Sequence, residues 1–153
     1  MKKGDRRKKR SSYKGTKGSR CVVCGQPAIT RPLHSVHDIL ACLQPFRDKK
    51  QEYFITLSLD SGGRLLRRRV VTIGLLDLSL AHPREVFAVP LTDRAASVII
   101  CHNHLSGSPE PSVEDIRTTQ QLVAAGILLG VPLRDHFILT MTGYLSFQEH
   151  SLI

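Results

Sequence analysis

The segment CHNHLSGSPEPSVED, from Cys101 to Asp115, carries the strongest structural and chemical signal in the chain. It follows an apolar, β-branched run over residues 95–101, which predicts a buried strand. Strand side chains alternate between faces, so the His102 and His104 imidazoles are expected on one face at the strand's C-terminal end. A turn-rich loop follows, and Asp115 is expected in the first turn of a helix. Two imidazoles and one carboxylate form a ligand set for catalytic zinc, with the fourth position left to water.

The same residues also have simpler interpretations. A histidine pair on a strand can be structural, because histidine fills many roles. Asp115 fits the first turn of a helix, where a negative charge is favourable, and Ser112 with Asp115 matches a capping box. Asn103 is expected on the opposite face of the strand, as a residue that forms hydrogen bonds around the site. Spacing alone therefore leaves the metal site and the structural interpretation open.

The segment HNHLSGSPEPSVED resembles the JAMM (MPN-type) metallohydrolase motif, His-x-His-x10-Asp with Ser three residues before the Asp, and specifically the bacterial RadC family. The similarity runs from about Arg31 to Ile153 in the family's order. It includes HSVHDIL, QEYFITLSLD, HPREVF, AAGILLGVPLRDHFIL and GYLSFQEHSLI. The resemblance implies an α/β (α+β), JAMM/cytidine-deaminase-like three-layer fold with a mixed central β-sheet flanked by helices. It also implies a zinc-dependent hydrolase that cleaves a peptide or isopeptide bond in a protein substrate, with His102, His104 and Asp115 as ligands.

Further site residues follow from the resemblance. A JAMM enzyme uses a Glu at the start of an early strand as its base, and Glu52 matches this position. Glu85 is the alternative base, but Glu52 is favoured because the start of a strand would aim it at the site. Ser112 matches the donor to the developing oxyanion, and it also fits a helix N-cap. Leu105 stands where the family usually has Pro, and Ser108 where Asp is common; both substitutions bear on loop rigidity and so on activity.

Other enzyme classes do not fit the sequence. The letters HNH do not indicate an HNH nuclease, whose histidines are spread over a ββα unit. A zinc deaminase needs His-x-Glu with Pro-Cys-x-x-Cys, and an α/β-hydrolase needs a Gly-x-Ser-x-Gly elbow; the sequence contains neither.

The net charge of +9 is concentrated at the N-terminus. Residues 1–20 contain ten Lys or Arg and one acid, while the rest of the chain has twelve basic and twelve acidic residues. We expect a disordered basic tail, because it has almost no apolar side chains. It is either a nucleic-acid-binding arm or a solubilising extension. The arm would be centred on Arg6, Arg7, Lys8, Lys9 and Arg10.

That arm suggests an alternative function, a non-catalytic DNA-associated accessory or repair protein with a metal-binding domain. No apolar stretch has the length of a membrane span, and no apolar segment follows the basic N-terminus as in a secretory signal. A cytoplasmic protein of the bacterial type without membrane contact is therefore expected. The sequence carries no signal for an oligomeric state.

Residues 21–34 contain the Cys21-Val-Val-Cys24 pair. With His34 and His37 this pair would form a structural zinc knuckle holding a second ion; the alternatives are a redox pair or two ordinary thiols. We expect three parts in the chain: a tail over 1–20, a cysteine-containing linker or knuckle over 21–34, and a RadC/JAMM-like domain over 35–153.

Periodicity predicts the order of elements in that domain. A helix over 35–48 is expected to end or kink at Pro45, and a second helix from His82 to be interrupted at Pro90. The helix that begins at Ser112 is expected to end at Gly126. Strands are predicted over 53–59, 64–73, 95–101 and 133–140, and a last short element after Gly143.

Overall fold

The computed structural model describes residues 32–74 and 81–153. The predictions for the basic tail over residues 1–20 and for the Cys21 and Cys24 pair lie outside the described residues.

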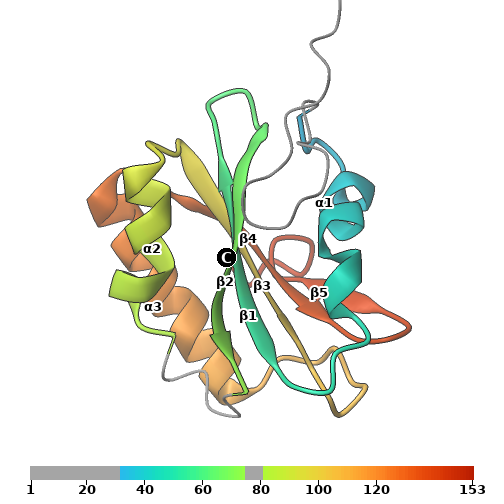
Figure 1. The fold of residues 1–153 in the computed structure, drawn as a ribbon. Coiled ribbons are helices and arrows are strands. Elements are labelled where there is room, and N and C mark those ends of the chain that lie inside the picture. The colour runs from blue at the N-terminus through green and yellow to red at the C-terminus, as the bar shows by residue number, and fades with distance from the viewer. Residues whose placement is uncertain (1–31, 75–80) are drawn as a thin grey trace, which may run out of the picture.

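The described helices and strands follow one another in the expected order. They are α1 (Val36–Leu43), the short 3-10 helix η1 (Gln44–Phe46), β1 (Tyr53–Leu59), β2 (Leu65–Ile73), α2 (Pro83–Thr92), β3 (Ser97–Asn103), α3 (Val113–Leu129), β4 (Leu133–Leu139) and β5 (Tyr144–Ser146). Helix α1 covers one face of the sheet, and α2 and α3 cover the other (Figure 1). The predicted three-layer α/β fold is confirmed.

The five strands form one mixed sheet in the order β2-β1-β3-β4-β5. Strand β1 is antiparallel to β2 and β3, β3 is parallel to β4, and β4 is antiparallel to β5. The parallel pair needs a crossover connection, which α3 supplies. Strand β3 lies at the centre, and all seven of its residues are buried, as expected for a strand covered on both faces.

Alternation along β3 assigns its side chains to two apolar cores. Ile99 and Cys101 pack in the core beneath α1, whereas Val98 and Ile100 pack in the core beneath α2 and α3. Continuing this alternation turns His102 toward the face that α2 and α3 cover, and Asn103 toward the α1 face. The pattern of the core therefore fixes the face on which the candidate ligands lie.

Local signals explain where α1 begins and ends. Ser35 caps its first turn in a capping box with Asp38, as its sequence pattern indicates. Pro45 stops the α-helical hydrogen bonding and lies in η1, so the predicted break there is confirmed.

Two expected helix ends are wrong. Helix α3 continues past Gly126, which is buried where the chain approaches closely: an added Cβ would lie 2.8 Å from the Val131 carbonyl oxygen. The helix ends instead at Gly130, whose φ of 69° suits glycine. Pro90 lies inside α2 rather than interrupting it, and the helix continues for only two residues beyond it, to Thr92.

Within residues 32–74 and 81–153, no helix combines the length and apolar character needed to cross a membrane.

Candidate metal centre

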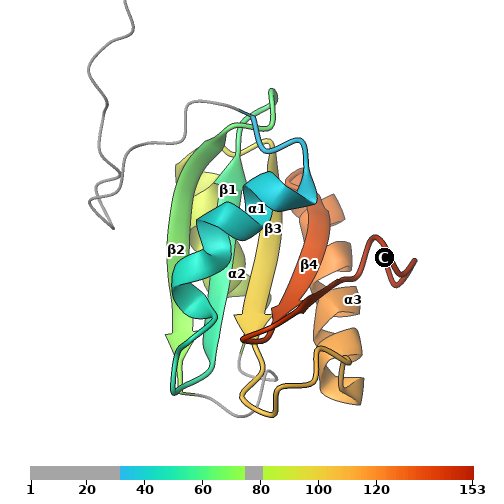
Figure 2. The same cartoon turned by 90° about the vertical axis from the view of Figure 1, so that its right-hand side faces the viewer.

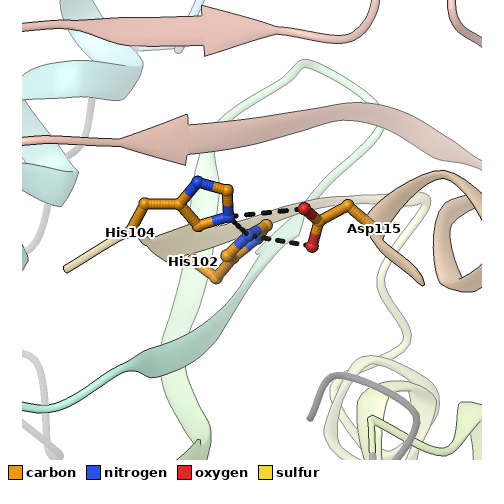
Figure 3. Close-up of side chains that lie close together, drawn as sticks. All are labelled: His102, His104 and Asp115. Atoms are coloured by element: carbon orange, nitrogen blue, oxygen red, sulfur yellow. Dashed lines mark hydrogen bonds and ion pairs between the residues drawn. The ribbon is translucent and has the colours of Figure 1, made fainter. Parts of the chain in front are cut away.

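The C-terminal end of β3 carries two of the three predicted ligands. His102 lies within the strand and His104 follows its last residue. Asp115 lies in the first turn of α3, which begins near this end of the sheet (Figure 2). The two imidazoles and the carboxylate turn toward one another (Figure 3). The structure thus brings together all three residues that the sequence motif singled out.

The spacing of the three side chains suits a small cation. The two imidazole Nε2 atoms lie 2.9 Å apart. His102 Nε2 is 3.2 Å from Asp115 Oδ1, and His104 Nε2 is 3.3 Å from Asp115 Oδ2. Ligand atoms around a tetrahedral zinc ion, with bonds of about 2 Å, lie roughly 3.3 Å apart. The residues present therefore fit a single ion held by two nitrogens and one oxygen.

Burial and hydrogen bonding set the charges of these groups. Burial alone would raise the pKa of Asp115, but its contacts with the two histidines and with Ser112 hold that pKa well below its usual range. Burial lowers the pKa of His102, while the hydrogen bond to Asp115 raises the pKa of His104. Asp115 is therefore an anion and His102 a neutral imidazole at neutral pH, which are the forms that bind metals.

The loop after β3 orients the second imidazole. His104 Nδ1 lies 2.9 Å from the backbone oxygen of Ser108. A carbonyl oxygen can only accept, so His104 Nδ1 carries the hydrogen and donates it. In the neutral ring this leaves the Nε2 lone pair facing the site. Ser108 acts here through its main chain, so the side-chain departure from the family's Asp leaves this contact intact; Leu105 is exposed beside it.

A third histidine, which the sequence reasoning missed, stands behind the site. His136 on β4 is fully buried, with Nε2 only 2.8 Å from His102 Nδ1 and Nδ1 2.6 Å from Thr119 Oγ1. Burial holds the pKa of His136 well below its usual value, so this ring is neutral. No spacing rule links position 136 to the motif, because the parallel pairing of β3 and β4 creates the contact.

Ser112 has the helix-capping role. Its hydroxyl donates to Asp115 Oδ2 at 2.7 Å and accepts from the Asp115 backbone N–H at 3.1 Å. Its own backbone N–H donates to the same carboxylate oxygen at 2.6 Å. The capping box thus orients a candidate ligand, and the Ser112 side chain remains exposed at the edge of the site.

Strand register separates the two candidate bases. Phe54 is the last residue of β1 that pairs with β3, and its partner is His102; continuing this register by two residues would set Glu52 opposite His104. The Glu52 charge favours the raised pKa of His104 and opposes the burial that lowers the pKa of His102. Glu85, on α2, instead forms an ion pair with Arg84 at 3.1 Å and is half exposed.

Asn103 holds the chain around Glu52. Its side-chain oxygen accepts from the Tyr53 backbone N–H at 2.7 Å, and its amide donates to the Gln51 carbonyl oxygen at 3.0 Å. The two contacts bracket Glu52 and confirm that Asn103 lies opposite the ligands as a hydrogen-bonding residue. His34 and His37, considered as partners of the cysteine pair, are both exposed near the start of α1.

Comparison with known proteins agrees with this geometry. A family model described as the RadC-like JAB domain matches residues 33–152. A UPF0758 protein of Methanosarcina acetivorans is 44% identical over 124 residues, covering 80% of this chain and 54% of the relative.

Two further relatives carry the same name. One from Methanospirillum hungatei is 47% identical over 112 residues, with 73% of this chain and 49% of the relative covered. One from Protochlamydia amoebophila is 40% identical over 120 residues, with 78% of this chain and 52% of the relative covered. The chain spans about half the length of the curated relatives it matches. From its fold, its ligand cluster and these matches, the chain belongs to the family of RadC-like JAB domains.

Proposed function

We propose that this domain is a zinc-dependent hydrolase of the JAMM type that cleaves a peptide or isopeptide bond. The observation that carries the proposal is the convergence of His102, His104 and Asp115. The register of β1 and β3, continued past Phe54, supports Glu52 as the base beside them. Two imidazoles and one carboxylate are a catalytic zinc set, since they leave one position for water. A purely structural zinc site has four protein ligands.

Each residue has a role in that reaction. A zinc ion bound here would supply a water with its pKa lowered to about 7 and would polarise the substrate carbonyl. Glu52 accepts the proton that the attacking water loses and passes it to the leaving amine. Asn103 holds Glu52 in place through its contacts with the main chain on both sides.

Ser112 combines structural and chemical roles in this proposal. Its hydroxyl caps α3 in the free protein by donating to Asp115. Rotation of the same exposed hydroxyl toward the substrate would direct its hydrogen to the developing oxyanion, where one donor contributes about 10²- to 10³-fold to turnover. The capping box would still keep the backbone N–H of Ser112 on Asp115.

The test uses the chain loaded with one equivalent of zinc and two classes of fluorogenic reporter, linear peptides and peptides joined through a lysine side chain. We expect Glu52→Gln to bind zinc as the wild type does and to lose at least about 10²-fold in turnover, because a general base contributes that much. Glu85→Gln is the matched control and should keep both properties. Unchanged cleavage by Glu52→Gln would remove Glu52 as the base.

Failure of the zinc-loaded wild type on both reporter classes would contradict the hydrolase and favour a metal-binding module without catalysis. The charge distribution supports such a second function, because residues 1–20 carry the whole net charge of +9. We propose that these residues bind the DNA backbone.

Fluorescence anisotropy with a labelled duplex tests this second function. Binding should weaken steeply between about 50 mM and about 200 mM salt, because phosphate contacts release counterions. Deleting residues 1–20 should abolish it. Binding that survives the deletion, or that ignores salt, would contradict a DNA-binding tail.

A further inference from the structure

His136 and Thr119 form a buried polar chain behind the candidate metal site. Both side chains are fully buried, and neither is among the three candidate ligands. Thr119 lies on α3 one turn after Asp115, and His136 lies on β4 beside β3. The chain of contacts runs from the Asp115 carbonyl through Thr119 and His136 to His102.

The single hydroxyl hydrogen of Thr119 gives this chain a direction. Thr119 Oγ1 lies 2.6 Å from the backbone oxygen of Asp115, which can only accept, so the hydroxyl donates to that oxygen. Its remaining lone pairs face His136 Nδ1 at 2.6 Å, which must then carry a hydrogen and donate it. The opposite arrangement would place two oxygen lone pairs against each other at this short distance.

The hydrogen bond at Thr119 also fixes which atom donates between His136 and His102. A neutral imidazole with a hydrogen on Nδ1 has a lone pair on Nε2. His136 Nε2 therefore accepts, and the donor 2.8 Å away is His102 Nδ1. With its hydrogen on Nδ1, His102 presents an unprotonated Nε2 to His104 and Asp115, which is the form that a metal ion needs.

Aromatic packing keeps the two rings in this arrangement. Phe147 stacks on the His136 ring with centroids 4.6 Å apart and planes at 22°, and Phe54 stacks on His102 at 6.3 Å and 10°. A ring flip of either histidine would exchange a nitrogen for a carbon and break the chain. His136 Nε2 points at His102 Nδ1, so His136 supports a ligand and is not a fourth ligand.

We propose that His136 and Thr119 are positioning residues that fix the His102 tautomer and thereby raise the metal affinity of the site. This inference rests on the metal site of the proposed function, but it does not require hydrolysis. Partners that orient a ligating histidine in this way typically contribute about 10- to 100-fold to metal affinity.

Two matched pairs of variants test the proposal on the full chain by zinc competition titration. Thr119→Val removes the hydroxyl with little change in shape, and Thr119→Ser keeps it. His136→Asn loses the acceptor near His102, and His136→Gln can place an amide oxygen there. We expect zinc to bind about 10- to 100-fold more weakly to the Val and Asn variants, with a smaller loss for the Ser and Gln variants.

A second readout distinguishes positioning from packing. Long-range proton–nitrogen NMR spectra of the metal-free protein, at about pH 8, report which ring nitrogen of a neutral histidine carries the hydrogen. We expect His102 to be protonated on Nδ1 in the wild type and in Thr119→Ser, and to move toward the other tautomer in Thr119→Val.

Equal zinc affinity in all variants, or equal weakening within each pair, would overturn the proposal. An Nε2-protonated His102 in the wild type would overturn it as well. If the wild type bound no zinc, the proposed function would fail, and the NMR spectra would still decide whether the chain sets the His102 tautomer.

Discussion

Two helices of this protein begin with nearly the same four residues, and only one of those beginnings lies at the candidate metal site. Helix α1 starts at Ser35-Val-His-Asp38, and α3 starts at Ser112-Val-Glu-Asp115. Both form capping boxes with the same contacts: the serine hydroxyl donates to the aspartate at 2.7 Å and accepts from its backbone N–H at 3.1 Å.

The surroundings make the difference between the two carboxylates. Asp38 lies on α1, which covers the opposite face of the sheet from α3 (Figure 1). Asp115 is 1% exposed, and each of its oxygens lies within 3.3 Å of a histidine Nε2 on β3. The same local motif therefore caps a helix in one place, and in the other it also presents a candidate ligand. Four changes would break or sharpen this comparison.

The largest expected effect comes from replacing the two aspartates. Asp115→Asn should lose one zinc per chain relative to the wild type, because it removes the anionic ligand. Asp38→Asn should keep the zinc content of the wild type. Elemental analysis of both purified variants checks this, and an unchanged zinc content in Asp115→Asn would show that the cluster is not a metal site.

The second-largest effect is expected on turnover, from replacing each of the two capping serines. Ser112→Ala is expected to lower turnover by about 10²- to 10³-fold if its hydroxyl serves the developing oxyanion. Ser35→Ala should leave turnover unchanged, because α1 lies away from the site. Steady-state kinetics on the reporter that the wild type cleaves compares them, and equal turnover would reduce Ser112 to a helix cap.

The pH dependence of metal binding should distinguish the two aspartates as well. Asp115 raises the pKa of His104, so this ring keeps its proton to a higher pH than an ordinary histidine, and zinc must displace that proton. Zinc affinity should therefore fall as the pH drops through the raised pKa, by about tenfold per pH unit for one proton. His102, whose pKa is lowered by burial, begins to compete only at lower pH.

Zinc competition titrations from about pH 8 to about pH 5 measure this profile. The profile of Asp38→Asn should match that of the wild type. An affinity that does not change over this range would contradict the assignment of His104 as a ligand.

The smallest effect should be shared by both caps. Ser35→Ala and Ser112→Ala in the metal-free protein should each lower the free energy of unfolding by about 1 kcal/mol, since each loses an N-cap hydrogen bond. Urea denaturation in the presence of a chelator checks this. A much larger loss for Ser112→Ala would mean that Asp115 depends on its cap to remain buried without metal.

Much of this fold could be predicted from the chain alone. The boundaries of β1 and both capping boxes follow from alternation and from short-range hydrogen bonding, which depend on neighbouring residues. The end of α3 could not be predicted in this way. Gly126 looks like a helix terminator, but close contact with Val131 requires a glycine there, and that contact exists only in the folded chain.

For the candidate site too, sequence patterns predicted one part and contacts between distant elements decided the other. The spacing of His102, His104 and Asp115 suggested a ligand set, because strand alternation and a capped helix are local properties, and the resemblance to the JAMM motif favoured it over a structural interpretation. Sequence reasoning preferred Glu52 to Glu85 because a position at the start of a strand would aim it at the site. The pairing of Phe54 with His102 supports that preference, because it sets the register that leads back to Glu52.

The sequence by itself thus determined the elements, the faces of β3 and the residue types of a metal site. Only the tertiary structure decided that Asp115 contacts His102 and His104 while Asp38 lies on the other face of the sheet. It also decided that His136 contacts His102 Nδ1. The physical reason is that helix caps and strand faces arise from interactions a few residues apart. Contacts between β3, α3 and β4 depend on how the sheet is ordered and covered.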